Sequence, residues 1–365
     1  MRDFVGANYY APMNAISEVI AYEPKIVQCT QCFNEEAFIW YALKSIYNEV
    51  DYIRVVEGAV ENQVNATEDG HSTDNTVKII KDFMENEDPD NKVSLIQVDR
   101  PWKNLEEIKQ QFIKQNVIGE WNLIVDGDEQ YIPSDVKLLK KLIELYPTAS
   151  EFIPNFLHFY GDFEHIAKPV PEWQPQHQRF YRYQPGMQYK SHPIVTDKDG
   201  QCTYFSPHYQ YRRFVVKDWY VWHYGYSRPN MREVLQKKQK YYHKELAKHG
   251  GADKPFDEKV NVFLNNLEKD EDFCSYPLEE HPDIMKGHPM FTYKDPKWKD
   301  RKLQDWKSVE PYSLEECPNI WLWMSGLNPR MPKFINQVSF EEVSLSGLSE
   351  LTKQAQELDM GYENE

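Results

Sequence analysis

The amino-acid sequence predicts an α/β fold with a mostly parallel central sheet and helices on both of its faces. Strand-like and helix-like hydrophobic patterns alternate from residue 25 to residue 150, and such alternation is typical of a parallel sheet covered by helices. After residue 150 the chain is rich in proline, aromatic residues and histidine. This change predicts an irregular, aromatic-rich and partly helical C-terminal region.

Four strands and four helices are expected in the first 150 residues. Short apolar runs predict strands over residues 25–33, 51–58, 92–99 and 121–125. Apolar residues spaced by three and four predict helices over residues 35–48, 72–86, 104–117 and 133–146. Later in the chain the patterns predict a strand over residues 218–227, a helix beginning at Pro229 and a terminal helix over residues 344–358.

The patterns divide the chain into four parts. Residues 1–24 form an N-terminal extension, and residues 25–150 form the first α/β half of the domain. Residues 151–245 are expected to complete that domain, and residues 246–365 to form a helical or irregular extension.

Composition excludes several classes of function. A formal net charge of −16 provides no general attraction for nucleic acid. No run approaches the roughly 20 apolar residues of a membrane span, and the first residues lack the apolar segment of a secretory signal. Five cysteines, an odd number, fit a reducing compartment, so a cytoplasmic location is expected.

The segment EWNLIVDGDEQYIPSD (residues 120–135) ends an apolar run at Asp126, Asp128 and Glu129. Gly127 permits a sharp turn, so two carboxylates can converge on one cation instead of repelling each other. Oxygen ligands favour Mg²⁺ or Mn²⁺, ions that also bind diphosphates. Ligands of parallel sheets bind beyond the carboxyl ends of the strands, where these acids and Glu57 fall. An ordinary solvated acidic turn is the alternative interpretation.

Three blocks of sequence resemble the family 2 glycosyltransferases of the GT-A fold. IVQCTQCFNEEAFIWYALKSI is similar to their first strand and helix, and DYIRVVEG with GHSTDNTVKIIKDF to their second block. GEWNLIVDGDEQYIPSD is similar to their metal-binding Asp-x-Asp block. The three blocks lie within residues 25–150 and follow the family's order.

The resemblance implies a role for each matching residue in the binding of a nucleotide-diphospho sugar. Gln31, Phe33 and Glu35 would lie against the nucleoside, and Glu57 would accept a hydrogen bond from the base. Asp126 would contact ribose or metal. Asp128 would hold the metal that bridges the diphosphate, and His223 would be a third metal ligand. Arg179 and His192 would bind substrate.

The sequence departs from the family's pattern in three places near the nucleotide. Glu57 stands where the family more often has Asp, and Gly58 replaces a second acid. The insertion AVENQVNATED is expected to move GHSTDNT away from Glu57, leaving Asp74 as a helix cap. Gln110 stands where many relatives have Arg.

The catalytic base is also altered. Relatives carry a His-Glu pair, whereas Pro193 follows His192 here. Asp197 is the favoured replacement because it lies near His192 in the sequence. Three other acids qualify by type, namely Glu172, Asp162 and Glu164.

The resemblance implies a glycosyltransferase that depends on Mn²⁺ or Mg²⁺ and moves a sugar to a hydroxyl of a carbohydrate or other acceptor, with inversion. A sugar nucleotidyltransferase and a non-catalytic carbohydrate-binding protein are the alternatives. Against the nucleotidyltransferase, no glycine-rich loop with a basic residue follows the first strand. Neither the donor sugar nor the oligomeric state is specified by the sequence.

Overall fold

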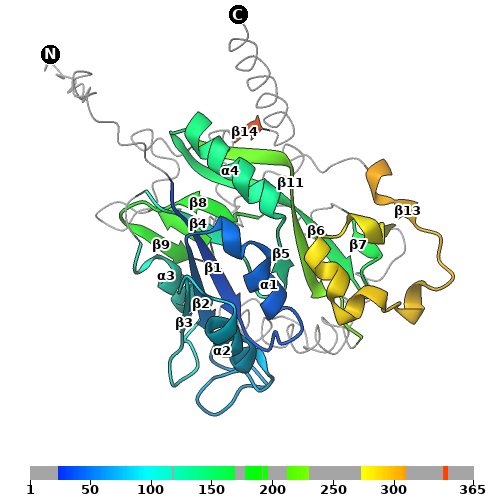
Figure 1. Ribbon diagram of the computed structural model, residues 1–365, viewed down its shortest axis with the longest axis horizontal. Helices are drawn as coiled ribbons and strands as arrows, with labels where there is room; N and C mark the ends of the chain where they lie inside the picture. The colour runs from blue at the N-terminus through cyan, green and yellow to red at the C-terminus, as the bar shows by residue number, and fades with distance from the viewer. Residues whose placement is uncertain are drawn as a thin grey trace, which may run out of the picture.

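The computed structural model describes residues 24–116, 119–168, 177–190, 192–195, 212–229, 273–309 and 340–343. The predicted α/β fold with a mostly parallel central sheet is confirmed (Figure 1). Strands β3 (Val93–Ile96), β2 (Tyr52–Glu57), β1 (Ile26–Cys32) and β4 (Trp121–Ile124) lie side by side and parallel. β1, β2 and β4 are almost wholly buried, and their mostly apolar sequences include buried polar side chains such as Gln28 and Asn122, whereas β3 is partly exposed.

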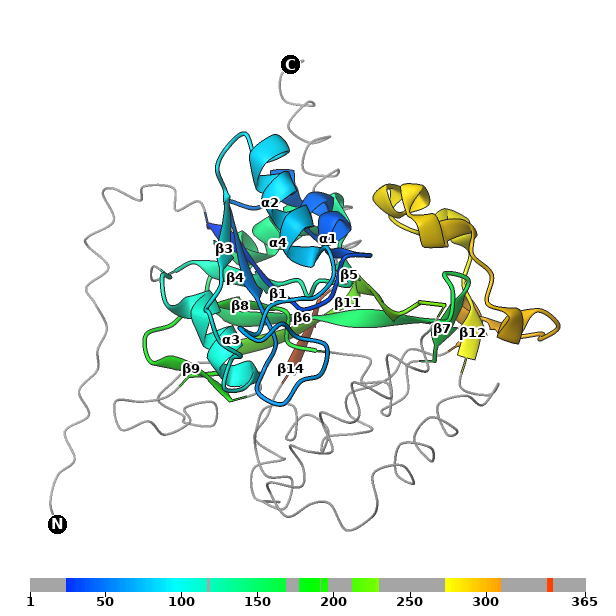
Figure 2. The same ribbon diagram turned by 90° about the horizontal axis from the view of Figure 1, so that it is seen from below.

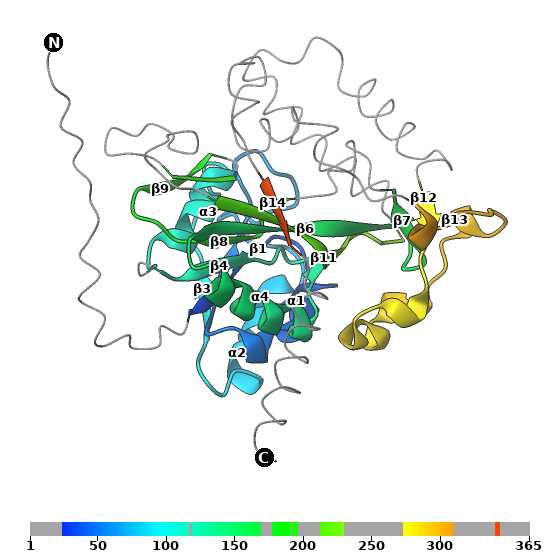
Figure 3. The same cartoon turned by 90° about the horizontal axis from the view of Figure 1, so that it is seen from above.

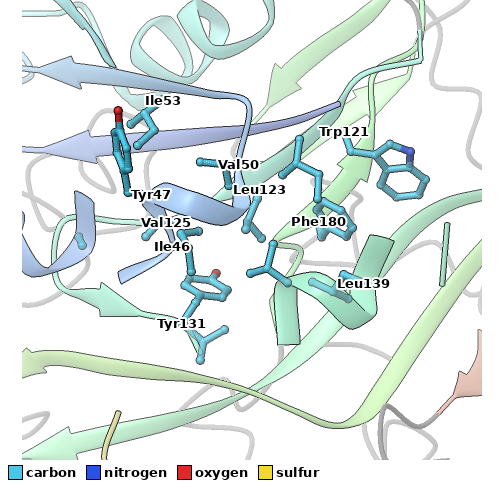
Figure 4. Close-up of a cluster of buried hydrophobic side chains, with 14 of the residues drawn as sticks. Ile46, Tyr47, Val50, Ile53, Trp121, Leu123, Val125, Tyr131, Leu139 and Phe180 are labelled. Atoms are coloured by element: carbon cyan, nitrogen blue, oxygen red, sulfur yellow. The ribbon is translucent and has the colours of Figure 1, made fainter. Parts of the chain in front are cut away.

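Three helices connect these four strands, and a fourth lies between β5 (Glu129–Gln130) and β6 (Ala149–Tyr160). They are α1 (Ile39–Ser45), α2 (Thr76–Asn86), α3 (Leu105–Ile113) and α4 (Pro133–Leu145). Figures 2 and 3 place α1, α2 and α4 on one side of the sheet and α3 on the other. One apolar cluster joins α1, α2 and α4 to the sheet, and Figure 4 shows part of it around Leu123, Val125 and Leu139. A second cluster joins α3 to the opposite side chains of the strands, such as Val27 and Ile124.

Two of the helices begin later than predicted. Residues 36–38 form a turn, and the Glu35 carbonyl accepts hydrogen bonds from the backbone N–H groups of Phe38 (3.0 Å) and Ile39 (2.9 Å). Helix α2 begins only at Thr76, whose backbone N–H donates to the Asp74 carboxylate at 2.9 Å. Before α2 the carboxylate of Asp74 thus binds the first backbone N–H, whereas α1 begins after Phe38 with no side-chain capping hydrogen bond.

The sheet continues through two long strands that run side by side in Figure 1. Strand β6 (Ala149–Tyr160) was not predicted, and β11 (Arg212–Tyr226) is longer than the predicted strand over 218–227. The register shifts where Pro154 lies in β6, since Ile153 pairs with Val215 but Asn155 pairs with Tyr220. Proline has no N–H to donate, so a bulge opposite it keeps the two strands together.

The other strands are short. β8 (Phe180–Arg182) lies antiparallel between β4 and β6, and β5 (Glu129–Gln130) pairs with β11. β7 (His165–Ala167) extends the sheet, and β9 (Met187–Lys190) with β10 (His192–Val195) forms a separate hairpin.

The described residues beyond 246 are attached to the same sheet. β12 (Phe273–Ser275) pairs with β7 and with β13 (Gln304–Asp305), and β14 (Phe340–Val343) pairs with β11. Short 3-10 helices lie between β12 and β13, as drawn in yellow and orange in Figure 1. One more follows α1 and one follows β13, so the described 3-10 helices are Tyr47–Glu49, Leu278–Glu280, Asp283–Gly287, Pro289–Thr292, Pro296–Trp298 and Trp306–Ser308.

An aromatic cluster fastens this C-terminal segment to β6 and β11. Tyr276 and Met285 are buried with Phe159 and Tyr224. His281 lies among them, accepting a hydrogen bond from the Tyr224 hydroxyl (2.7 Å) and donating one to the Phe163 carbonyl (2.7 Å).

The remaining predictions on organisation stay open. The division of the chain at residues 24, 150 and 245 stays a prediction, although β6 begins at Ala149 and β12 belongs to the main sheet. The predicted helices from Pro229 and over residues 344–358 fall outside the described residues. No helix among the described residues is both long and apolar enough to cross a membrane.

Candidate functional site

The acidic turn after β4 is attached to the end of β1. The backbone N–H of Gly127 donates to the Gln31 carbonyl at 3.1 Å. A side chain at Gly127 would crowd Glu35, because a Cβ there would lie 3.1 Å from its Cγ. The glycine therefore allows the turn to pack closely and places Asp126 and Asp128 at the carboxyl edge of the sheet, where ligands of parallel sheets bind.

Arg179 holds one side of this acidic turn. Its guanidinium donates to both oxygens of Glu129, at 3.1 and 2.6 Å, and to Oδ2 of Asp126 at 3.1 Å. Burial raises the pKa of the Glu129 carboxyl to about 7, since repulsion from Asp126 adds to burial and the attraction of Arg179 opposes it. Such two-pronged contacts fix the geometry of both carboxylates.

Two oxygens at this edge are buried without a hydrogen-bond partner in the described part of the chain. They are Oδ1 of Asp126 and Oε1 of Gln31. Most buried polar atoms in proteins are hydrogen-bonded, so each such exception calls for an explanation. A bound cation or a ligand N–H or O–H group would satisfy them.

The turn also meets β11 at His223. Oδ2 of Asp128 lies 3.7 Å from Nε2 of His223, and Nδ1 of His223 lies 3.0 Å from Nδ1 of His158. Gly225 borders the pair, and a Cβ there would lie 2.1 Å from Oδ2 of Asp128 and 2.9 Å from Nε2 of His223. The absence of a side chain at residue 225 therefore allows Asp128 and His223 to pack directly against the backbone of β11.

This donor set suits a divalent cation. Asp126 supplies an unpaired carboxylate oxygen, Asp128 a second carboxylate, and His223 an imidazole that carboxylate-bound Mn²⁺ accepts readily. Within the described ranges, no three His, Cys, Asp or Glu side chains are gathered closely enough to hold a metal ion. The residue types thus suit a cation in their chemistry, and their metal binding stays a prediction.

Glu57 lies at the end of β2 in a different setting. It is fully buried, and its Oε1 accepts hydrogen bonds from the backbone N–H (2.8 Å) and hydroxyl (2.7 Å) of Ser72. Its Oε2 accepts from Nδ1 of His71 (2.9 Å) and Nε2 of Gln97 (2.8 Å). The expectation that the insertion moves GHSTDNT away from Glu57 is therefore wrong, because the inserted loop leaves the strand and returns to it.

Residues near the first strand are joined to β11 by an ion pair. Glu35 pairs with Arg228, which follows β11 and lies over the ring of Phe38 at 5.3 Å. Burial by itself lowers the pKa of Arg228, but Glu35 and then Asp128 raise it above the ordinary value. Phe33 is half-buried at the same edge.

Lys109 on α3 is a site residue that the sequence analysis missed. It is half-buried, and burial lowers its pKa while the charge of Asp126 opposes the shift. Its neighbour Gln110, which was compared with an Arg of relatives, accepts a hydrogen bond from the backbone N–H of Tyr189 at 3.2 Å. The positively charged side chain beside the acidic turn is thus Lys109, one residue before Gln110, the position at which many relatives carry Arg.

The candidate catalytic bases are unequally placed. Asp162 is buried and accepts hydrogen bonds from His165 (2.6 Å) and from the backbone N–H of Asp295 (3.0 Å). Glu164 pairs with Lys294. Asp197 and Glu172 fall outside the described residues, as does the side chain of His192, whose backbone begins β10.

Comparison with known proteins gives only weak similarities. No family model matches the sequence, and no curated protein matches it. Residues 1–349 of S. aureus TarS share 16% identity, with 67% of this chain and 71% of that chain covered, at a TM-score of 0.35.

Two further solved structures match at lower TM-scores and over less of this chain. Glucosyl-3-phosphoglycerate synthase from Mycobacterium tuberculosis, with Mn²⁺, uridine diphosphate and glucosyl-3-phosphoglycerate, shares 19% identity over 38% of this chain and 44% of that chain, with a TM-score of 0.26. Mannose-6-phosphate isomerase from Helicobacter pylori shares 12% identity over 44% of this chain and 61% of that one, also at 0.26. Glycosyltransferases are thus among the structures that this chain weakly resembles, and at these TM-scores the resemblance carries no functional argument.

Proposed function

We propose that this chain is a metal-dependent, inverting glycosyltransferase of the GT-A type that transfers a sugar from a nucleotide-diphospho sugar to an acceptor hydroxyl. One observation carries the proposal. The acidic turn at the carboxyl edge of the sheet directs Asp128 toward His223, and Asp126 beside it keeps an unpaired buried oxygen. A purely structural acidic turn would not be expected to leave a buried carboxylate oxygen unpaired beside a second carboxylate and a histidine.

The chain's own residues would prepare a cation site. Arg179 occupies Oδ2 of Asp126 and so leaves its Oδ1 for the ligand. His158 contacts Nδ1 of His223 and so leaves Nε2 toward Asp128. Fixed tautomers and orientations of this kind are a common support for metal-binding histidines.

Mn²⁺ or Mg²⁺ held by Asp126, Asp128 and His223 would supply Lewis-acid stabilisation of the departing nucleoside diphosphate. Lys109 and Arg228 would add positive charge on either side of that diphosphate. Gln31, Phe33 and Glu35 would lie along the nucleoside, and their position at the end of β1 agrees with that role.

The acceptor side rests on sequence alone. Asp197 would remove the proton of the acceptor hydroxyl as the sugar is transferred, and His192 with Arg179 would help to bind substrate. Asp162 is a weaker candidate for this task, because both its oxygens already accept hydrogen bonds from the protein.

The test is thermal stability in the presence of nucleoside diphosphates and nucleotide sugars, with Mn²⁺ or with a chelator. A ligand at 100 times its Kd stabilises the native state by about 2.7 kcal/mol. We expect a Mn²⁺-dependent rise in Tm with one nucleotide, and no such rise for Asp128→Asn. Product analysis then separates the enzyme classes, since release of pyrophosphate would favour a nucleotidyltransferase. No rise with any nucleotide would overturn the proposal.

A further inference from the structure

Glu57, which was expected to accept a hydrogen bond from the nucleotide base, already accepts its hydrogen bonds from the protein. The two oxygens of Glu57 accept four hydrogen bonds from the protein, and the side chain is fully buried. The indole N–H of Trp102 donates a hydrogen bond to the backbone carbonyl of Glu57 at 3.0 Å. A base approaching the end of β2 would therefore meet another residue first.

That residue is His71, which follows the insertion at the point where the chain returns to the end of β2. Its side chain is 19% exposed, whereas that of Glu57 is 0% exposed. His71 thus lies between the buried carboxylate and the surface, at the same carboxyl edge as the acidic turn. Gln97, the second donor to Oε2 of Glu57, follows β3 and lies beside it.

The insertion holds His71 firmly. The backbone N–H of Ala59 donates to the Gly70 carbonyl at 2.8 Å, and the backbone N–H of His71 donates to the Thr67 hydroxyl at 2.8 Å. Gly70 has a φ of +87°, and a Cβ there would lie 2.5 Å from the backbone nitrogen of Pro101. The loop therefore packs directly on the turn before α3, which limits the movement of the imidazole.

The hydrogen bonds define which ring nitrogen is available. An ionised carboxylate only accepts, so Nδ1 of His71 carries the hydrogen that Glu57 receives, and when the ring is neutral its Nε2 is an acceptor. Two more acceptors face Nε2, since carboxylate oxygens of Asp69 and Asp99 each lie 3.9 Å from it. This edge of the site presents acceptors and calls for a donor on the ligand.

We propose that His71, positioned by Glu57, contacts the nucleotide base and selects a base whose ring nitrogen carries a hydrogen. Uracil at N3 and guanine at N1 have this hydrogen, whereas N3 of cytosine and N1 of adenine are themselves acceptors. A buried acceptor facing another acceptor loses its hydrogen bond, and this disfavours cytosine and adenine. The inference rests on the proposed function and specifies the donor as a uridine or guanosine diphospho sugar.

The test is calorimetric binding of UDP, GDP, CDP, ADP and N3-methyl-UDP to the full chain with Mn²⁺. One hydrogen bond of this kind corresponds to about a ten-fold change in Kd. The unsubstituted protein should bind UDP or GDP about ten-fold more tightly than CDP and ADP. N3-methylation removes the donor and should weaken UDP by a similar factor. For His71→Ala we expect weaker UDP or GDP binding and equal Kd values for all these nucleotides.

His165→Ala is the matched control, because His165 also contacts a buried carboxylate and its side chain is 15% exposed. It should keep the base preference unchanged. The inference is overturned if His71→Ala keeps both affinity and preference, or if the unsubstituted protein prefers CDP or ADP. The N3-methyl-UDP measurement on unsubstituted protein decides the base-edge contact even if His71→Ala does not fold. If no nucleoside diphosphate binds the unsubstituted protein, the proposed function itself fails and the base preference with it.

Discussion

Two strand ends at the same edge of the sheet carry carboxylates in opposite states. At the end of β2, Glu57 accepts four hydrogen bonds and is fully buried. After β4, Asp126 keeps one buried oxygen without a partner in the described residues, and Asp128 lies 3.7 Å from His223. The protein itself supplies the hydrogen bonds of Glu57, whereas Asp126 and Asp128 are placed to bind a ligand.

The difference shows how to separate structural acids from functional ones. Satisfied buried carboxylates stabilise the fold, whereas clustered and incompletely bonded acids cost stability and persist where a ligand needs them. Position at the edge of the sheet does not distinguish the two. The number of hydrogen bonds that each carboxylate accepts does distinguish them. Substitutions at four positions test this difference, in order of decreasing expected effect.

The largest effect is expected at Asp128. Asp128→Asn removes a charge that the cation needs, and turnover should fall on the order of 1,000-fold. The measurement is the release of nucleoside diphosphate from the nucleotide sugar that stabilises the protein most. Asp82→Asn, on the exposed face of α2, is the control and should keep full activity. Equal activity of the two variants would contradict the functional reading of the acidic turn.

Glu57 should matter for stability instead. Glu57→Ala leaves the N–H and hydroxyl of Ser72 and the amide of Gln97 without their acceptor, and unfolding free energy should fall by about 3 kcal/mol. Asp128→Ala should cost less than about 1 kcal/mol, because it also relieves repulsion within the acidic turn. Urea denaturation measures both. Equal losses would mean that the two sites do not differ in the way described.

A third buried polar group, His281, extends the comparison to pH. Burial lowers its pKa to about 4, although its hydrogen bond to the Phe163 carbonyl opposes the shift. The unfolded state therefore binds a proton first, and the stability due to neutral His281 is complete above about pH 6.5 and decreases as the pH falls toward 4. At pH 5 the loss should be about 2 kcal/mol. Urea denaturation at pH 7 and pH 5 should show a smaller difference for His281→Gln, and an unchanged difference would contradict the assignment.

The smallest effect is expected from a single methyl group. In Gly225→Ala the new Cβ would displace Asp128 and His223, so affinity for Mn²⁺ and nucleotide should fall by about ten-fold. Gly287→Ala is the matched control, because a Cβ there meets no atom within 4 Å. Titration calorimetry compares the two. Equal affinities would mean that the close packing of Asp128 and His223 against Gly225 is not needed for binding.

Much of the first half of the fold follows from local sequence pattern. The strands from β1 to β4 are rich in apolar residues, and each helix has an apolar face, so short windows are sufficient to locate them. Strand β6 was missed because Pro154 argues against a central strand, and only the bulge in β11 reconciles the two. The bulge lies about sixty residues after Pro154 in the sequence, so no local sequence pattern can indicate it.

The candidate site was predictable in part for the same reason. Asp126 and Asp128 follow a strand directly, and the end of a strand in a parallel sheet is a place that topology determines. The partners of Glu57 were not predictable, because the path of the insertion depends on contacts such as that between Gly70 and Pro101. Lys109 was missed because its approach to the acidic turn depends on how α3 packs and not on spacing alone.

The pairing of β14 with β11 has a consequence for how the chain folds during synthesis. Strands β1 to β4 pair with one another within the first part of the chain, so all the partners in this part of the sheet are present early in synthesis. β5 pairs with the later part of β11, but the stretch from Arg213 to Val216 is paired with β14 only when residues 340–343 arrive. Until then a nascent chain carries a stretch of β11 whose backbone groups lack the β14 partner, and open strand edges of this kind can recruit other chains. Chains that stop before residue 340 should therefore aggregate more readily than complete ones.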